Sequence, residues 1–333
     1  MPWHGFPLDA PEARAVYEAM QARIPGFFLL DLMDGQVRPR PKRTFFTDEE
    51  VGVIGRITHP ALGRLRAYCG LLTQAMARRP PGRPVTIGLF IGDQLGVEPP
   101  VPVLTFQKPR GSRQLLLPDW DFLRHDHYRA ASFHDPIPFA HKRDKAGFVG
   151  ATSGLPSITL EDVQALRLPR LRAAVAFRDS PQVDFMLPRI VQAASPEVEA
   201  AIRALGLDSR APGWTDMFVY RYLLSMDGNG ACCSRVAIAL RSNSVLVKYD
   251  SPHRLHYFER LVPWRHYIPV AADTEVLRAL AFCAMHPNLA EGIAESSRDF
   301  FAATLVPEVL IAYTAELLSA YAQACSGDMP TAH

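Results

Sequence analysis

The residues that most clearly suggest chemistry form a glycine-rich turn between two apolar runs. The run Tyr-Arg-Tyr-Leu-Leu at 220–224 predicts a strand, and the Asp-Gly-Asn-Gly sequence after it predicts a tight turn. A helix is expected over 231–241, with Arg235 about one turn inside it. Glycines let the backbone approach a ligand, and free amides at a helix start attract anions, so an anion site and an ordinary strand–turn–helix connection both fit. The candidate residues are Asp227, Gly228, Asn229, Gly230 and Arg235.

A second candidate group is a carboxylate that follows a buried strand. The run Val-Thr-Ile-Gly-Leu-Phe-Ile at 85–91 is short and apolar on both faces, which is typical of a buried parallel strand. Asp93 follows it directly and should emerge at the strand's carboxyl end, where α/β sheets bind their ligands. There it could act as a general base or, as a turn aspartate, accept hydrogen bonds from nearby amides.

Two carboxylates flank an aromatic residue in Asp119-Trp120-Asp121. Hard divalent cations prefer carboxylate oxygens, so this pair is a candidate metal site. His125, Asp126 and His127 stand beside it and could imitate a metal cluster. Because adjacent residues of a strand point to opposite faces, a solvated loop explains these three residues better.

Several motifs in a fixed order resemble glycosyltransferase family 90, which contains the protein O-glucosyltransferases and the CAP10-like capsule proteins. That family shows a Tyr-x-Tyr-Leu strand, a glycine turn, an Arg on the next helix, a further strand and a Lys-Pro-Trp-x-His-Tyr-x-Pro-Val stretch. Val262 stands here in place of the Lys, and Cys232-Cys233-Ser234 replaces the usual Ser and aromatic residues. The resemblance covers roughly residues 84–305 and is closer in its second half. The matching segments are 220–223, 228–235, 244–248 and 261–270.

This resemblance implies a GT-B-like α/β fold, in which two Rossmann-like lobes have a cleft between them and a helical tail follows. The first lobe would be 1–140 on the acceptor side, the second 141–305 around the nucleotide sugar, and the tail 306–333. The family also implies a UDP-sugar donor and inversion at the anomeric carbon. It implies no metal ion, and no other cofactor is expected.

The resemblance also assigns roles to single residues. Arg235 corresponds to the family arginine that contacts the diphosphate, and Asp93 to the aspartate that deprotonates the acceptor hydroxyl. The segment 148–154, Phe-Val-Gly-Ala-Thr-Ser-Gly, resembles a Phe-Arg-Gly-Ser-x-Thr loop that borders the donor, with Val149 where Arg or Lys is often seen. Small and hydroxylated residues suit phosphate oxygens. By resemblance, the donor-side residues are Gly150, Ala151, Thr152, Ser153 and Asp216, and the acceptor-side residues are Asp119, Trp120 and Asp121. Arg172, in a basic helix start at 168–172, could also face the donor phosphates.

The function expected from these motifs is sugar transfer from a UDP-sugar to a saccharide hydroxyl. A bacterial role in surface polysaccharide or lipopolysaccharide assembly would fit, with a saccharide or glycolipid as acceptor. One alternative is a metal-dependent GT-A transferase that uses Asp119 and Asp121, although 117–122 also resembles a Pro-x-Trp-x-Phe segment of family 90 that binds no metal. Another is a nucleotide- or carbohydrate-binding protein without catalysis, motivated by the departures at Val149, Cys232 and Cys233. The motifs leave the transferred sugar and the oligomeric state open.

Composition agrees with a globular protein of two lobes. The chain has 333 residues, of which 48% are hydrophobic and 21% charged, and its net charge of +2 favours no nucleic-acid partner. The N-terminal residues lack a basic stretch followed by an apolar run, and the five cysteines form no Cys-x-x-Cys pair. A cytoplasmic protein is therefore expected. Peripheral attachment to the inner membrane through Arg38–Arg43 and Arg110–Arg129 is an open alternative to solvated loops.

The expected elements alternate between strands and helices, which favours parallel sheets. Residues 107–145 are expected to be rich in loops, and Trp264 and His266 are expected to be packing residues. Helices are predicted at 9–25, 47–78, 159–177, 196–205, 231–241, 273–285, 288–304 and 306–325. Strands are predicted at 85–91, 103–106, 146–150, 217–224, 244–248 and 266–270.

Overall fold

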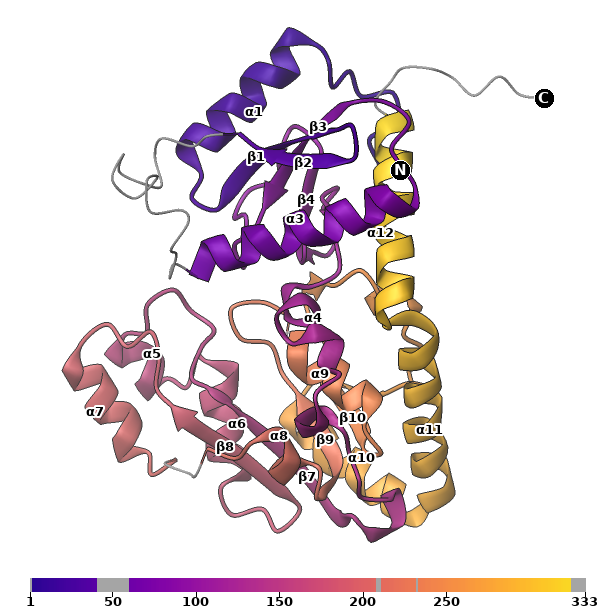
Figure 1. Cartoon of the computed structure of the whole chain (residues 1–333). Coiled ribbons are helices and arrows are strands. Elements are labelled where there is room, and N and C mark those ends of the chain that lie inside the picture. Colours follow the sequence, from indigo (N-terminus) through magenta and orange to yellow (C-terminus); the bar gives the residue numbers. More distant parts are fainter. Residues whose placement is uncertain (1, 41–59, 208–210, 232, 325–333) are drawn as a thin grey trace. The chain divides into compact units, whose positions relative to one another are not determined.

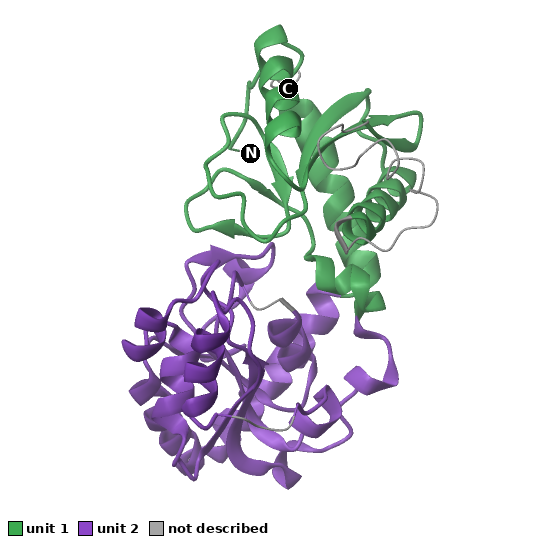
Figure 2. Ribbon diagram, turned by 90° about the vertical axis from the view of Figure 1, so that its left-hand side faces the viewer, with its two compact units in different colours: residues 1–127, 306–333 green, residues 128–305 purple. Residues whose placement is uncertain are grey.

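The computed structural model describes residues 2–40, 60–207, 211–231 and 233–324 (Figure 1). The chain divides into two compact units (Figure 2). The first unit is 1–127 together with 306–333, and the second is 128–305. The division thus falls at 127 instead of 140, and the last helix belongs to the first unit instead of forming a separate tail.

The first unit has a mixed sheet with the strand order β2-β1-β3-β4-β6. Strands β1 and β2 form a hairpin around Asp34 and Gly35, both of which have positive φ, and β1 also runs antiparallel to β3. The pairs β3–β4 and β4–β6 are parallel. The strands predicted at 85–91 and 103–106 are confirmed, but the prediction of an all-parallel Rossmann-like first lobe is wrong. The strands are β1 Phe27–Met33, β2 Gln36–Pro39, β3 Val85–Phe90, β4 Val103–Thr105, β5 Lys108–Pro109 and β6 Leu115–Leu116.

Helices of the first unit come from both ends of the chain, because α12 packs along α3. The predicted helices 9–25 and 306–325 correspond to α1 and α12. Only the second part of the predicted helix 47–78 is described, as α3, since 47–59 lies outside the described residues. Residue 325 and the basic residues Lys42 and Arg43 also lie outside them. The helices are α1 Pro11–Arg23, α3 Pro60–Arg78, α4 Trp120–Arg124 and α12 Pro307–Ala324.

The second unit is built on a parallel sheet with the strand order β12-β10-β9-β7-β8. The chain leaves β7 toward β8 on one side and later returns to β9 on the other side. The carboxyl ends of β7 and β9 therefore form a topological switch point, where open α/β sheets bind ligands. The strands are β7 Arg143–Ala151, β8 Val183–Arg189, β9 Tyr220–Ser225, β10 Val245–Tyr249, β11 His253–Arg254 and β12 Ile268–Val270.

Helices cover this parallel sheet and complete its core. Tyr222 and Leu224 of β9 belong to a buried cluster with residues of α6 and α10, so Leu223 points to the opposite face, where α9 contacts β9 and β10. The helix predicted at 159–177 is interrupted, because Leu166 has a φ of 48° and Pro169 starts a new helix. The helices are α5 Leu160–Gln164, α6 Pro169–Phe177, α7 Pro196–Ala204, α8 Trp214–Met217, α9 Cys233–Arg241, α10 Asp273–Met285 and α11 Pro287–Thr304.

The segment 107–145 is rich in loops, as expected. Cys69 and Cys283 carry free thiols, while Cys232 and Cys325 lie outside the described residues. No single described helix is long and apolar enough to cross a membrane, although α11 and α12 taken together pass that test as a bent pair. The 3-10 turns are η2 Asp126–Tyr128, η3 Ala131–Phe133, η4 Phe139–His141 and η5 Phe258–Arg260.

Candidate functional site

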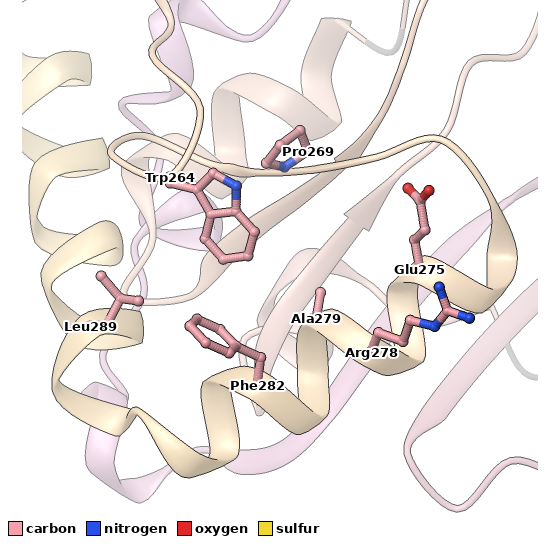
Figure 3. A pocket seen from close by; sticks show the side chains of 7 residues that line it. All are labelled: Trp264, Pro269, Glu275, Arg278, Ala279, Phe282 and Leu289. Carbon is pink, nitrogen blue, oxygen red and sulfur yellow. The ribbon is translucent and has the colours of Figure 1, made fainter.

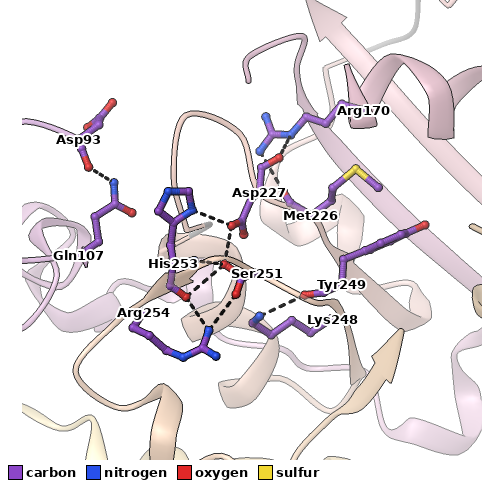
Figure 4. Close-up of polar contacts among 10 residues, drawn as sticks. All are labelled: Asp93, Gln107, Arg170, Met226, Asp227, Lys248, Tyr249, Ser251, His253 and Arg254. Atoms are coloured by element: carbon purple, nitrogen blue, oxygen red, sulfur yellow. Dashed lines mark hydrogen bonds and ion pairs between the residues drawn. The ribbon is translucent and has the colours of Figure 1, made fainter. Parts of the chain in front are cut away.

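Arg170 joins the two loops that leave the sheet at the switch point. Its side chain comes from the first turn of α6, and the residue is only 6% exposed. Its Nη1 donates to the carbonyl of Ala151, the last residue of β7, at 3.0 Å and to Oγ of Ser153, in the loop that follows, at 2.8 Å. Its Nη2 and Nε donate to the carbonyls of Met226 and Asp227 at 3.0 and 3.1 Å, in the loop after β9 (Figure 4). A buried guanidinium with four such bonds holds both loops in a defined geometry.

Gly228 lies against this arginine. A Cβ atom added to Gly228 would be 2.5 Å from Oγ of Ser153 and 2.8 Å from Nη2 of Arg170. No larger residue fits without displacing one of them. The sequence predicted that Gly228 makes room for a ligand. In the structure, the absence of a side chain at Gly228 makes room for Ser153 of the neighbouring loop and for Arg170.

A second guanidinium group joins the first above one aromatic ring. Phe148 of β7 stacks on Phe185, with ring centroids 4.0 Å apart. The Cζ atoms of Arg235 and Arg170 lie 4.2 and 5.5 Å from the centroid of the Phe148 ring. Arg235 also donates to the carbonyl of Val149. Both cations stand at the carboxyl edge of the sheet, near the start of α9, so this edge is suited to an anion.

The carboxylate of Asp227 contacts two residues of the loop after β10. Its Oδ2 accepts a hydrogen bond from Oγ of Ser251 at 2.5 Å and lies 3.1 Å from Nδ1 of His253 (Figure 4). Oγ of Ser251 also accepts from the backbone amide of His253 at 3.0 Å. The carboxylate therefore ties the loop after β10 to the loop after β9. Sequence reasoning missed Ser251 and His253, although both follow the strand next to β9.

The predicted donor loop after β7 is held by its own side chains. Thr152 is fully buried, and its Oγ1 donates to the carbonyl of Val191 and accepts from the amide of Val191, at 3.0 and 2.9 Å. Ser153 accepts from Arg170, as described above. Gly150 lies close to Arg235, since an added Cβ would be 3.4 Å from its Nη2. Asn229 is exposed and Gly230 buried at the tip of the other loop.

Arg172 points away from the loops that Arg170 joins. Its Nε lies 3.0 Å from Oδ2 of Asp273, the first residue of α10, and its side chain is 47% exposed. Oη of Tyr249 donates to the other oxygen of the same carboxylate at 2.8 Å. Arg172 thus forms an ion pair between α6 and α10. The arginine of this segment that contacts the loops at the switch point is Arg170.

Asp216 lies at the opposite edge of the sheet. It accepts from the backbone amide of Gly213 at 3.1 Å and so closes the first turn of α8. That turn precedes β9, whose six residues rise about 3.3 Å each, or roughly 20 Å in all. Asp216 therefore lies roughly one strand length from the other predicted donor residues of the second unit. The structure gives no support for contact between Asp216 and a ligand bound at the switch point.

Asp93 is brought together with side chains from three other segments of the first unit. It follows β3, its side chain is 46% exposed, and its carboxylate lies 3.0 Å from Nη1 of Arg64 on α3. Gln107, after β4, donates to the backbone carbonyl of Asp93 (Figure 4). The Cζ of Arg64 is 5.6 Å from the ring centroids of both Phe106 and Trp120. Sequence reasoning found Asp93 and Trp120 but missed Arg64 and Gln107.

Asp119 is a helix cap and not a candidate metal ligand. It is fully buried, and it accepts from the backbone amide of Asp121 at 3.1 Å. Burial, and secondarily the charge of Asp121, raises the pKa of Asp119 well above its usual range. A proton kept on Asp119 would compete with a metal ion for its carboxylate oxygens. Among the residues described by the structure, no group of three or more metal-ligating side chains is found, including around His125 and His127.

One protein-family model matches a segment that lies mostly in the second unit. Residues 202–329 match the family model described as glycosyl transferase family 90. The match includes β9, the glycine turn, Arg235 and the Ser251–His253 loop.

The chain aligns with less than half the length of the curated relatives that it matches. Protein O-glucosyltransferase 2 of Danio rerio is 31% identical over 109 residues, which cover 32% of this chain and 22% of that protein. Protein O-glucosyltransferase 3 of Homo sapiens is 24% identical over 239 residues, covering 68% of this chain and 43% of that protein. The matched part is thus less than half of each relative.

Solved structures show weak similarity. TarM aligns with a TM-score of 0.39 and 11% identity, over 56% of this chain and 36% of TarM. The C-terminal domain of the group 1 glycosyl transferase LpcC from Francisella tularensis aligns with a TM-score of 0.29 and 12% identity, over 50% of this chain and 88% of that chain.

Proposed function

We propose that this protein transfers a sugar from a UDP-sugar to a hydroxyl group of a saccharide, with inversion and without a metal ion. The observation that carries the proposal is the pair of guanidinium groups, Arg170 and Arg235, at the switch point of a parallel sheet. Arg235 lies in the segment that matches family 90. Relatives named protein O-glucosyltransferase support sugar transfer as the reaction class.

The donor diphosphate would bind at the start of α9. The positive end of the α9 dipole favours an anion there. Arg235 would contact the phosphate oxygens. Arg170 would add charge and fix the two loops, because its four hydrogen bonds span them. Two guanidinium groups can offset the charge that a divalent cation offsets in metal-dependent transferases.

Asp93 would serve as the general base in the first unit. Its carboxylate takes the proton of the acceptor hydroxyl as that oxygen bonds to the anomeric carbon. The bond from the anomeric carbon to the diphosphate oxygen breaks on the opposite face, and its electron pair leaves with UDP. The exposed carboxylate of Asp93 is open to a hydroxyl group, and its ion pair with Arg64 orients it.

The family resemblance alone supports the remaining parts of the proposal. These are a GT-B-like pairing of the lobes, and a saccharide or glycolipid acceptor used in surface polysaccharide or lipopolysaccharide assembly. A cytoplasmic location is proposed as well, with peripheral attachment to the inner membrane through basic segments such as Arg110–Arg129. None of these is needed for the chemistry assigned to Asp93 and Arg235.

A donor screen tests the proposed reaction. The purified chain is incubated with UDP-glucose, UDP-xylose, UDP-galactose or UDP-N-acetylglucosamine and with oligosaccharide acceptors, in excess EDTA. Release of UDP is measured together with the mass and anomeric configuration of the product. The proposal expects at least one donor to be consumed in EDTA, with an inverted product. Activity that disappears in EDTA and returns with Mn²⁺ would favour the metal-dependent alternative, and absence of both hydrolysis and transfer would favour a binding protein.

A further inference from the structure

Large apolar side chains gather on one surface of the second unit. Among the described residues, few large hydrophobic side chains are exposed, and most of those in this unit lie around α10 and the loop before β12. The exposed fractions are 46% for Val262, 43% for Trp264, 39% for Phe282, 71% for Met285 and 41% for Leu289. Such clusters on a globular surface mark binding sites more often than isolated apolar residues do.

Part of this surface is hollow (Figure 3). The hollow has a volume of about 520 Å³, which is within the range of small-ligand sites. It lies beside β12, the outer strand of the sheet, so β10 lies between it and the two strands of the switch point, β9 and β7. It is lined by Trp264, Pro269, Glu275, Arg278, Ala279, Phe282 and Leu289.

The backbone holds Trp264 in an unfavourable conformation that keeps its indole exposed. Its φ is 61°, in the left-handed region that a bulky residue rarely adopts. The amide of Trp264 donates to the carbonyl of Tyr267 at 2.7 Å, and Nδ1 of His266 accepts from the amide of Val262 at 3.0 Å. His266 is a buried packing residue as predicted, but the same prediction for Trp264 is wrong. A strained backbone at an exposed aromatic residue is a sign of function.

The aromatic rings offer apolar surface at one end of the hollow. The rings of Trp264 and Phe282 meet edge to face, with centroids 5.7 Å apart and an interplanar angle of 82°. Ala279 and Leu289 extend this apolar lining (Figure 3). An indole held in this way can pack against the C–H face of a flat, partly polar ligand.

Polar groups of opposite charge stand at the other end. Glu275 and Arg278 lie one turn apart on α10 and both line the hollow (Figure 3). One oxygen of Glu275 accepts from the amide of Ala271 at 2.6 Å, which fixes the carboxylate. An acceptor and a donor with no net charge suit a neutral ligand with hydroxyl groups. A phosphate group or an anionic lipid would instead meet a carboxylate as well as the single guanidinium of the lining.

We propose that this hollow binds one or more pyranose rings of a neutral saccharide. Trp264 and Phe282 pack against the C–H groups of a ring, while Glu275 and Arg278 hydrogen-bond its hydroxyl groups. The site is separate from the switch point and does not depend on the transfer reaction proposed above.

Calorimetric titration with maltohexaose, cellohexaose and laminarihexaose tests this site, on the wild-type chain and on Trp264→Ala and Glu275→Gln. We expect at least one hexasaccharide to bind, and Trp264→Ala to weaken that binding about tenfold or more. Glu275→Gln keeps an oxygen that can accept from the amide of Ala271, so it should fold normally and bind several-fold more weakly. Met285→Ala is the matched control, because Met285 is more exposed than Trp264 but does not line the hollow.

Two results would overturn the proposal. One is that none of the three hexasaccharides binds; the other is that binding is equal in the wild type, Trp264→Ala and Glu275→Gln. Vesicles of phosphatidylcholine with and without phosphatidylglycerol, and sedimentation of the free protein, are run in parallel. Vesicle binding or self-association that Trp264→Ala abolishes, without any saccharide binding, would assign the surface to a membrane or to a second copy. UDP affinity, measured on the same samples, keeps this outcome distinct from failure of the transferase proposal.

Discussion

The carboxyl edges of the two sheets carry opposite kinds of group. In the second unit, Arg170 and Arg235 gather over Phe148 next to a glycine turn. In the first unit, the corresponding edge presents the carboxylate of Asp93 beside Arg64. One edge is suited to holding an anion and the other to accepting a proton, so the two halves of the proposed reaction belong to different units.

The two edges also differ in how firmly their groups are fixed. Arg170 is 6% exposed and its hydrogen bonds go to four atoms of two loops, while the side chain of Asp93 is 46% exposed. A group that sets the shape of a binding loop benefits from burial. A base that receives a proton from an incoming hydroxyl must remain accessible. Substitutions at the two edges should therefore have different kinetic consequences.

The largest effect is expected for Asp93→Asn. Loss of the base should lower kcat by roughly 10²–10⁴ while leaving the dissociation constant for UDP unchanged, because an amide keeps the shape but cannot take the proton. Steady-state kinetics and calorimetric titration with UDP measure the two quantities. Arg64→Gln is a useful companion, since it leaves Asp93 in place and should reduce kcat less. Near-normal turnover by Asp93→Asn would remove Asp93 as the base.

An intermediate effect is expected for Arg170→Lys. A lysine cannot make four hydrogen bonds in the fork geometry of Arg170, so the loops should loosen and UDP affinity should fall about tenfold. The matched control is Arg172→Ala, two residues along the same helix. Its half-exposed ion pair with Asp273 should contribute less than about 1 kcal/mol to stability, and its loss should leave UDP affinity unchanged. The reverse order of effects would restore the interpretation of Arg172 as the donor residue.

These two arginines show where sequence reasoning reached its limit. A basic helix start was visible at 168–172, but successive helical residues turn by about 100°, so Arg170 and Arg172 project in nearly opposite directions. Only the path of the chain decides which of them faces the switch point. The prediction that Asp216 lies near the donor meets a related limit. A residue just before a strand lies a full strand length from the carboxyl end of that strand.

Long periodic elements were the most predictable part of the fold. The predicted helix 273–285 has the bounds of α10, and the glycine turn does lie beside Arg170 and close to α9. The hairpin β1–β2 was missed although Asp34-Gly35 is a typical hairpin turn, and β8 was missed because Asp184 and Pro188 interrupt its apolar pattern. The exposure of Trp264 had no signal in the sequence, since a positive φ is a property of the folded loop.

The smallest effect on activity is expected for Asp119→Asn. Asn caps helices as well as Asp does, and Asp119 is a buried carboxyl with a raised pKa, so kcat should stay within about twofold.

The raised pKa of Asp119 also predicts that the stability of the protein depends on pH. An unfolded Asp loses its proton near pH 4 while the folded one keeps it, so the contribution of Asp119 to stability falls as the pH rises from about 4 toward its folded pKa. Urea unfolding between pH 4 and 8 should show this decline in the wild type but not in Asp119→Asn. Loss of activity in the variant, restored by added Mn²⁺, would contradict the capping role.

The central claim is that the switch point binds a diphosphate. A comparison of UDP with uridine tests this claim directly. Calorimetric titration with UDP and with uridine is carried out on the wild type and on Arg235→Ala. We predict that the wild type binds UDP at least about tenfold more tightly than uridine, and that Arg235→Ala lowers UDP affinity toward the uridine value without changing uridine affinity. Equal affinities of the wild type for UDP and uridine, or an unchanged UDP affinity in Arg235→Ala, would contradict the account.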